Sequence, residues 1–388
     1  MIQRFQTDWF LFIIAAGLAL FGSMMVYSAS AMIAQRETQG ASQFTYFNKQ
    51  ITFTVAGIAA MWVVSRFDYR IIERPAFVYG LLLLTVVLLC LVYAFPEING
   101  ARRWIRAGGF SLQPSELAKI SLPVFLAYRL SDVEAKVGDL KSSVLPCLAV
   151  LAILGGLVFF EPDLGTTLVL CAVFAVMYFA AGAPILHIAS LAGLMAIAGF
   201  AAVIVTPWRV ERFMAFLDPF AHSDDAGYQV VQSLYALGSG GVFGEGFAKG
   251  QQKLFYLPYP YSDFIFSVIG EEWGLIGTLG VVFVFGLFLW RGTRASVGAA
   301  DRFGMLLGIG LVTGIIVQAL FNISVVTSLL PAKGIPLPFV SYGGSSVVVT
   351  MIAAGIILSI SRVSDERPVR TGDDRVFRRK GRVGAAGK

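Results

Sequence analysis

One carboxylate in this sequence has both the residue type and the position expected of a general base. Asp263 ends a segment rich in Tyr and Pro and directly precedes an apolar block that begins near Phe264. A positioned carboxylate that accepts a proton in the transition state typically contributes about 10²–10⁴-fold in rate. Asp is also a favoured helix N-cap, so the structural alternative is that Asp263 caps the helix that begins near Phe264.

Two groups of charged residues lie where such side chains are normally avoided. Glu116 and Lys119 are three residues apart within an apolar block, which places them on one face of a helix. Ionisable residues inside a membrane favour a function by default, and a mutually neutralising pair is the structural alternative. Arg102, Arg103 and Arg106 lie in a loop that is predicted on the outer side, whereas the loops of membrane proteins that are rich in basic residues usually lie in the cytoplasm. They are candidates for binding either an anionic substrate group or lipid headgroups.

The elements that must position these residues are apolar blocks of about 17–25 residues, long enough to cross a bilayer as helices. The chain has 388 residues, of which 57% are hydrophobic and 14% charged, whereas a soluble protein carries about 25% charged residues. A closed barrel would alternate with period two, and these blocks do not. The sequence predicts an all-α integral membrane protein with about ten transmembrane helices. The blocks are approximately 9–30, 48–66, 76–95, 112–129, 144–160, 164–182, 184–206, 264–290, 303–328 and 340–361.

The basic residues predict the orientation of the chain in its membrane. Placing the N-terminus inside puts most of the basic short loops in the cytoplasm. Residues 1–361 then form the membrane domain, and 362–388 form a basic cytoplasmic tail that is predicted to be disordered. The net charge of +6 is therefore mostly a signal of topology rather than of nucleic-acid binding.

The longest predicted loop, about 207–262, connects spans seven and eight on the outer side. A long loop is usually functional or disordered, and this one is too aromatic for disorder. We expect it to fold against the membrane surface. Its Gly238–Gly241 stretch lacks the strand-to-helix context of a phosphate-binding loop, so we expect a flexible hinge and no nucleotide site.

Two further segments have both structural and functional interpretations. Glu161 and Asp163 flank Pro162 in a predicted tight turn, where turn formation and helix capping explain the residue types well and a cavity-lining role is the alternative. The small residues from Ser341 to Ser346 favour close helix packing, although they also leave room for a lipid tail or a phosphate. The three cysteines, Cys90, Cys147 and Cys171, fall inside apolar blocks and have no spacing suited to a disulfide framework or a metal.

Five segments, taken together and in this order, closely resemble the FtsW/RodA/SpoVE family, the SEDS proteins of bacterial cell-wall synthesis. The resemblance covers about residues 9–361, and the run Gln252–Pro258 and the pair Lys333-Gly334 look more like the division branch, FtsW, than the elongation branch, RodA. The five segments are Asn99–Ile105, Gln113–Lys119, Glu161–Thr167, Tyr261–Phe266 followed by Gly270–Glu272, and Pro331–Pro338 running into Ser341–Ser346.

The resemblance implies an inverting, processive glycosyltransferase that polymerises lipid II on the outer face of the membrane. Its implied partner is a class B penicillin-binding protein that cross-links the peptides. The family's essential aspartate matches Asp263. Because the leaving diphosphate is an anion, the site needs cations rather than the second carboxylic acid that hydrolyses an ordinary glycoside. We expect the substrate-binding residues to be Arg102, Arg103, Lys119, Glu116, Lys333 and Ser341.

One departure from the family pattern concerns the residues before the aspartate. The family usually carries Glu and His there, and this chain has Tyr259 and Tyr261. The resemblance also suggests that a divalent cation, Mg²⁺ or Mn²⁺, assists the reaction, although no ligand set is readable from the sequence. No nucleotide, haem or flavin is expected.

Two other functions compete with the enzyme. A polytopic bundle with intramembrane charges also fits a lipid II flippase, which should place charged groups along the whole crossing. A non-catalytic scaffold that recruits the transpeptidase predicts that replacing Asp263 leaves function intact.

Overall fold

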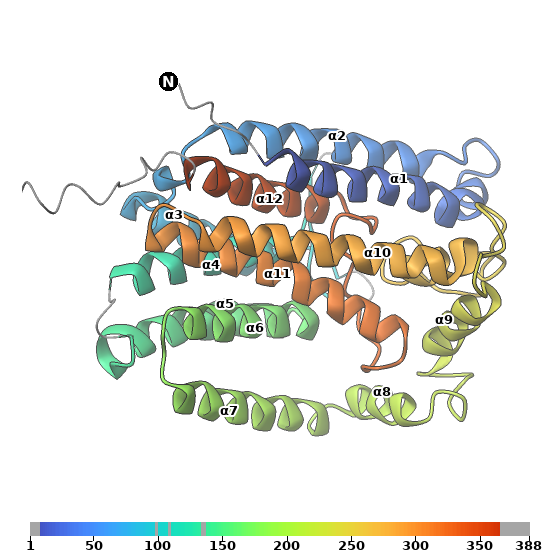
Figure 1. Cartoon of the computed structure of the whole chain (residues 1–388). Coiled ribbons are helices and arrows are strands. Elements are labelled where there is room, and N and C mark those ends of the chain that lie inside the picture. The colour runs from blue at the N-terminus through green and yellow to red at the C-terminus, as the bar shows by residue number, and fades with distance from the viewer. Residues whose placement is uncertain (1–7, 98–99, 108–109, 133–136, 365–388) are drawn as a thin grey trace, which may run out of the picture.

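The computed structural model describes residues 8–97, 100–107, 110–132 and 137–364, and almost all of the predicted basic tail lies outside this part of the chain. Each of the predicted apolar blocks forms a helix (Figure 1). The fold is an all-helical membrane protein, and six helical stretches of the described part are long and apolar enough to cross a membrane. The helices that match the blocks are α1 (Trp9–Glu37), α2 (Thr45–Arg66), α3 (Pro75–Leu91), α4 (Pro114–Asp132), α5 (Leu145–Phe160), α6 (Leu164–Ala180), α7 (Ile185–Ile204), α10 (Ile265–Val297), α11 (Arg302–Val326) and α12 (Gly344–Ser364).

The connections contain shorter elements, including two strands that the sequence analysis did not predict. Strands β1 (Ile105–Ala107) and β2 (Phe110–Leu112) pair antiparallel just before α4. The long segment between α7 and α10 is folded, and it contains α8 (Pro207–Leu217) and α9 (Tyr228–Ser239). Figure 1 shows α8 and α9 at one end of the bundle, which we call the loop end. Short helical turns are η1 (Tyr69–Ile71), η2 (Val92–Ala94) and η4 (Leu140–Val144).

Small residues bring α12 and the segment before it close to the first two helices. A Cβ added to Gly22 of α1 would lie 2.5 Å from the Cα of Val340, and one added to Gly355 of α12 would lie 2.7 Å from the carbonyl oxygen of Met61 in α2. Close backbone approach at small residues is a common way to pack membrane helices, because apolar surface gains little from leaving lipid. This packing fixes where residues 340–346 lie at the loop end.

Helix α10 is interrupted near the loop end, and the interruption is repaired by the long connection. Gly274 has φ 65° and ψ −158°, outside the helical region, so the helical hydrogen bonds on each side of it lose their partners. The N–H groups of Glu245 and Gly246 donate to the carbonyls of Glu271 and Glu272 at 2.9 and 3.0 Å. The connection therefore continues the hydrogen bonding of α10 across its break.

The glycines of this connection serve close packing, so the expected flexible hinge is wrong. A Cβ on Gly240 would lie 2.0 Å from the carbonyl oxygen of Gly270, and one on Gly244 would lie 2.2 Å from that of Glu272. Gly244 also has φ +81°, a conformation that Gly adopts without steric cost. The glycine stretch is pressed against α10.

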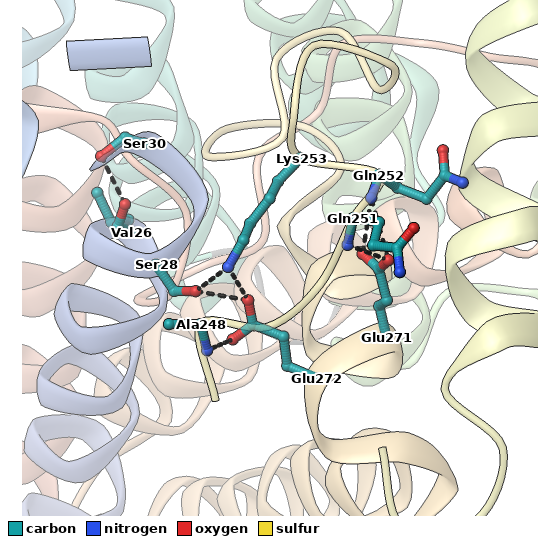
Figure 2. Close-up of polar contacts among 9 residues, drawn as sticks. All are labelled: Val26, Ser28, Ser30, Ala248, Gln251, Gln252, Lys253, Glu271 and Glu272. Carbon is teal, nitrogen blue, oxygen red and sulfur yellow. Dashed lines mark hydrogen bonds and ion pairs between the residues drawn. The ribbon is translucent and has the colours of Figure 1, made fainter. Parts of the chain in front are cut away.

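Two buried carboxylates of α10 fasten the next part of the connection (Figure 2). Glu271 accepts the backbone N–H groups of Gln251 and Gln252 at 2.6 and 3.0 Å. Glu272 pairs with the buried ammonium of Lys253 at 2.5 Å, and both groups contact the hydroxyl of Ser28 in α1. The segment that leads to Asp263 begins at these residues, so the contacts hold the start of that segment in place.

Candidate active site

A cavity of about 800 Å³ lies at the loop end, which we call the main cavity. Its walls come from α2, the β1–β2 hairpin and the segment before it, α4, the turn before α6, α8, α9, the segment before α10, α11, the loop at 333–336 and the start of α12. Charged side chains from most of these elements line it. The basic ones are Lys49, Arg103, Arg106, Lys119, Arg212 and Lys333, and the acidic ones are Glu116, Asp163 and Asp263.

Asp263, which the sequence analysis predicted as the base, lines the main cavity. Its Oδ1 accepts a hydrogen bond from the hydroxyl of Ser262 at 3.1 Å. A Cβ added to Gly334 would lie 3.0 Å from Oδ2 of Asp263, so the backbone of the loop between α11 and α12 lies directly beside the carboxylate. The N-cap of α10 is Phe264, with no side-chain capping bond. The alternative that Asp263 caps the helix is therefore wrong.

The electrostatic surroundings of Asp263 suit a base. Burial is the largest effect and raises the pKa of the Asp263 carboxyl to about 6. The hydrogen bond from Ser262 and the positive charge of Arg103 act in the opposite direction, and the charge of Asp163 adds a small rise. Desolvation disfavours the ionised form, and a base with a pKa near the working pH transfers protons efficiently.

The backbone that carries Asp263 is held by the segment just before α12. The N–H of Tyr342 donates to the carbonyl of Tyr261 at 2.9 Å. The hydroxyl of Ser341 donates to the carbonyl of Ser262 at 2.6 Å and accepts the N–H of Leu337 at 2.7 Å. Ser341 is buried by these protein contacts and does not line the main cavity. The geometry therefore gives it a positioning role, in place of the expected contact with substrate.

Asn322 of α11 completes this support. Its buried side-chain amide donates to the carbonyls of Asp263 and Ile335, both at 2.7 Å. One helical turn earlier, the amide of Gln318 donates to the carbonyl of Pro336 at 2.8 Å. Each buried carbonyl that finds a donor avoids a cost of about 1–3 kcal/mol. Three consecutive carbonyls, those of residues 261–263, are thus bound by three separate groups.

The predicted pair on α4 is present and faces the main cavity. The ammonium of Lys119 lies 2.7 Å from Oε2 of Glu116 and donates to Oε1 of Gln318 at 2.6 Å. Both members of the pair line the cavity, and both are nearly buried. The pair is therefore mutually neutralising, and its place on the cavity wall leaves the proposed contact between Lys119 and a substrate anion possible in geometry.

The three arginines of the segment before α4 differ in their placement. Arg103 lines the main cavity and donates to the backbone carbonyls of Glu161 and Pro162. Arg106 also lines the cavity. Arg102 is exposed and donates to the carbonyl of Tyr93 at 3.1 Å, away from the cavity wall. The structure brings Arg103 and Arg106 to the site and gives no support to the expectation for Arg102.

The turn before α6 is both a cap and part of the site. Oδ1 of Asp163 accepts the N–H of Thr166 at 3.0 Å, which caps α6, and the same side chain lines the main cavity. Glu161 is fully buried, and burial raises the pKa of its carboxyl to about 8. A Cβ on Gly165 would lie 2.5 Å from the side chain of Ile335, so this glycine lets the turn pack against the loop beside Asp263.

The two tyrosines that replace the family's usual Glu and His both line the main cavity. The ring of Tyr261 packs between two others, with its centroid 4.7 Å from that of Tyr46 and 5.6 Å from that of Tyr342. Aromatic pairs at these distances add stability beyond the burial of their area. Tyr261 therefore supports the backbone of Asp263 by packing, and Tyr259 presents a phenol hydroxyl to the cavity.

Sequence reasoning missed several residues of the site. Gln318, Asn322 and Arg212 received no role, and the structure places all three beside the predicted ones. The signal for the first two was available, because a Gln and an Asn four residues apart in an apolar helix mark one polar face. Arg212 lies in the connection between α7 and α10, and its distance from the site along the chain left no local signal.

No group of three or more His, Cys, Asp or Glu side chains that could hold a metal ion occurs among the residues the structure describes. Asp163 and Asp263 are two carboxylates that line the same cavity. A Mg²⁺ ion is usually held by one or two carboxylates together with substrate phosphates. The residues present therefore fit a cation that binds with a substrate.

With this geometry in hand, comparison with known proteins decides the family. Residues 8–366 match the FtsW/RodA/SpoVE family model, described as "Cell cycle protein". The chain belongs to the FtsW/RodA/SpoVE family. It is 39% identical over 373 residues to a probable peptidoglycan glycosyltransferase FtsW of Trichlorobacter lovleyi, with 95% of this chain and 96% of the relative covered. It is 38% identical over 370 residues to the stage V sporulation protein E of Bacillus subtilis, with 93% of this chain and 99% of the relative covered.

Solved structures share the fold of this chain. A chain from a peptidoglycan synthase complex, studied for how polymerization and crosslinking are coordinated, matches with a TM-score of 0.75 and 26% identity over 93% of this chain and 99% of that one. The rod shape determining protein RodA of Thermus thermophilus matches with a TM-score of 0.68 and 27% identity over 93% of this chain and 98% of RodA.

Proposed function

We propose that this FtsW/RodA/SpoVE family member is a peptidoglycan glycosyltransferase that polymerises lipid II into glycan strands for septal cell-wall synthesis. The observation that carries the proposal is a single carboxylate of raised pKa, Asp263, in a cavity lined by cations. Relatives with 38–40% identity carry the name "Probable peptidoglycan glycosyltransferase FtsW", which supports the division branch.

The reaction joins two lipid-linked sugars, and the cavity supplies what each partner needs. Asp263 accepts the proton of the acceptor hydroxyl, whose oxygen attacks the anomeric carbon of the donor while the bond from that carbon to the lipid diphosphate breaks. Attack from the face opposite the leaving group inverts the anomeric centre. The proton moves to Asp263, and the diphosphate leaves with the bonding electrons.

The leaving diphosphate requires cations that are already in place when the charge develops. Arg103 is held by two backbone carbonyls, and Lys119 is held by Glu116 and Gln318. Both side chains line the cavity with Asp263. Glu116 acts by orienting Lys119, and Lys333 adds a cation on the loop that contacts Asp263. Burial is the main reason that the pKa of Lys333 is lowered to about 8.

A divalent cation is part of the proposal. Mg²⁺ or Mn²⁺ would be held by Asp163 or Asp263 together with the substrate diphosphate, and it would supply charge stabilisation to the leaving group. Asp163 already accepts hydrogen bonds from Thr166, so its remaining lone pairs are the ones available to a cation.

We place the loop end of the bundle on the outer face of the cytoplasmic membrane, with both termini in the cytoplasm. The basic loops of the sequence support this orientation. The partner we propose is a class B penicillin-binding protein, because a structurally similar chain comes from a complex that couples polymerization and crosslinking.

Two assays, polymerisation in detergent and complementation of cell division, separate this function from a flippase and from a scaffold. Purified chain with its transpeptidase partner is given labelled lipid II in detergent, and glycan products are resolved on a gel. We expect polymer from the wild type and none from Asp263→Ala. The flippase predicts no polymer in detergent, and the scaffold predicts that Asp263→Ala supports cell division normally.

A further inference from the structure

Two arginines meet at the end of the bundle opposite the loop end, and we call them the arginine pair. Arg66 is the last residue of α2, and Arg362 lies in the last turn of α12, away from α8 and α9 in Figure 1. Nη2 of Arg362 donates to the backbone carbonyl of Arg66 at 2.7 Å. Among the residues that the structure describes, neither guanidinium has a carboxylate within ion-pair distance, whereas the neighbouring Arg70 pairs with Asp301 at 2.9 Å. The arginine pair is therefore a local excess of positive charge.

The C-terminal residues of the chain do not balance this charge. Residues 365–388, which lie outside the described part, contain eight basic and four acidic residues. The guanidinium of Arg362 is also poorly satisfied, because its Nε is buried without a hydrogen-bond partner among the described residues. A buried charge is costly unless an opposite charge or acceptors lie beside it. An anion from outside the chain would relieve that cost.

Aromatic side chains hold Arg66 and indicate the depth of the arginine pair in the membrane. The guanidinium of Arg66 lies 3.9 Å from the ring centroid of Trp62, one helical turn earlier. The ring of Trp62 packs against those of Trp9 and Phe12 in α1, at centroid distances of 5.5 and 5.8 Å. Tryptophan is enriched where the hydrocarbon meets the headgroups, so the arginine pair lies at the level of lipid phosphates. An arginine stacked on a ring keeps the edge of its guanidinium for phosphate oxygens.

Two exposed stripes lead from this point along the bundle, and together we call them the seam. The contact between Trp9 and Trp62 brings the stripes of α1 and α2 side by side. A Cβ on Gly17 would meet nothing within 4 Å, and several other residues of the seam are small, so an acyl chain can lie close against both helices. The exposed residues recur at helical spacing; they are Trp9, Ile13, Gly17 and Leu20 on α1, and Val55, Ala56, Ala59 and Val63 on α2, just before Arg66.

We infer that the arginine pair and the seam bind one anionic phospholipid, with its phosphate between the two guanidinium groups and an acyl chain along the seam. The site is separate from the proposed active site, since none of these residues lines the main cavity. In the orientation proposed above, the lipid belongs to the cytoplasmic leaflet, where anionic lipids attract basic segments. The positive-inside rule accounts for arginines at this end of the bundle. It does not require two of them to share one point beside an apolar seam, and this difference can be measured.

The test measures the binding of single lipids to the purified full chain in detergent by native mass spectrometry. Phosphatidylglycerol is the probe, and phosphatidylcholine, whose phosphate is balanced by its own ammonium group, is the comparison. We expect one phosphatidylglycerol to bind at least about tenfold more tightly than phosphatidylcholine, and Arg66→Gln and Arg362→Gln each to weaken that binding about tenfold, the loss expected for one charge-assisted hydrogen bond.

The matched control is Arg74→Gln, which removes the same charge from an exposed position just before α3. It should change the affinity by less than about twofold, because an exposed charge outside the site is screened by salt. General attraction between a basic surface and an anionic lipid predicts similar losses from all three variants, and that result would overturn the inference. Arg66→Lys should keep part of the binding, and an unchanged melting temperature without lipid shows that each variant is folded.

Three further measurements identify what occupies the arginine pair. Glycerol 3-phosphate, which has the phosphate without acyl chains, should compete far more weakly than phosphatidylglycerol. Ala59→Trp, which fills the seam and leaves every charge in place, should weaken the binding severalfold. The full chain with Asp365→Asn and Glu366→Gln should bind phosphatidylglycerol as the wild type does.

The opposite results overturn the inference. Equal competition by glycerol 3-phosphate would assign the arginine pair to a free phosphate. Tighter lipid binding after Asp365→Asn and Glu366→Gln would assign it to the carboxylates of the chain's own C-terminal residues. Equal affinity for phosphatidylcholine, or full binding by Ala59→Trp, would show that the arginine pair and the seam do not form one lipid site.

Discussion

Asn322 offers the sharpest test of how the fold positions the proposed base. Its amide donates to the backbone carbonyls of Asp263 and Ile335 at 2.7 Å each. The side chain is 1% exposed, so water cannot replace it when it is removed. Asn322→Ala removes this donor from both carbonyls, one of which belongs to the proposed base itself.

The size of the effect follows from these two bonds. An unsatisfied buried carbonyl costs about 1–3 kcal/mol, so the variant should lose about 2–6 kcal/mol of stability. Freed from its anchor, Asp263 can shift, and a misplacement of about 1 Å costs up to about 10²-fold in rate. We therefore expect kcat to fall about tenfold to a hundredfold. Loss of the carboxylate itself should cost more, at about 10²–10⁴-fold.

The assay is polymerisation of labelled lipid II by purified full chain with its transpeptidase partner, over a range of substrate concentrations. Asn322→Ala should lower kcat and leave KM within about twofold, because no substrate contact is removed. Asn322→Asp has nearly the same size without the donor hydrogens and should lose a similar factor. The matched control is Asn48→Ala, on the exposed face of α2. If Asn322→Ala melts at a lower temperature yet keeps its kcat, the amide supports the fold alone and our reasoning is refuted.

Three further predictions concern neighbouring features. Because burial raises the pKa of Asp263 to about 6, kcat/KM should rise as the pH increases through about 6, and a flat profile from about pH 5 to 8 would count against the base assignment. The folded pKa lies above the unfolded value of about 3.9, so the same ionisation should lower the melting temperature between about pH 4 and pH 6. Gly334→Ala, which adds a Cβ 3.0 Å from Oδ2 of Asp263, should lower kcat severalfold, while Gly156→Ala, with nothing within 4 Å, should not. Lys253→Met leaves the buried carboxylate of Glu272 uncompensated and should cost about 3–5 kcal/mol of stability, most of which Glu272→Gln should restore in the double variant. If Lys253→Met alone is as stable as the double variant, the buried carboxylate of Glu272 does not need its ion pair and the reasoning is wrong.

The sequence sets the secondary structure and the candidate base for direct physical reasons. Apolar blocks of bilayer length have one common solution, since a helix satisfies its own backbone hydrogen bonds in lipid, and every block forms a helix. The charges of Asp263, Glu116 and Lys119 are conspicuous because they interrupt or adjoin such blocks. The family motifs then favour Asp263 as the candidate base, a choice that its position alone leaves even with helix capping.

The sequence could not decide the placement of side chains whose partners come from distant parts of the chain. Arg102 and Arg103 are neighbours with the same chemistry, yet one donates to Tyr93 on the surface and the other lines the cavity. Ser341 lies two residues before a glycine pair, and its hydroxyl both donates to and accepts from backbone groups, those of Ser262 and Leu337. Neither outcome has a signal in local spacing, because the partners come from other elements.

The amino-acid sequence by itself determined the helices and the family, and it selected Asp263 as the candidate base, because length, polarity and motif are local properties of the chain. Tertiary structure alone decided that α11 anchors the backbone of Asp263, and that cations from the segment before β1, from α8 and from the loop at 331–334 gather around a second cavity. These contacts join segments far apart in sequence, and many of them use backbone carbonyls, which every residue carries and no residue type reveals.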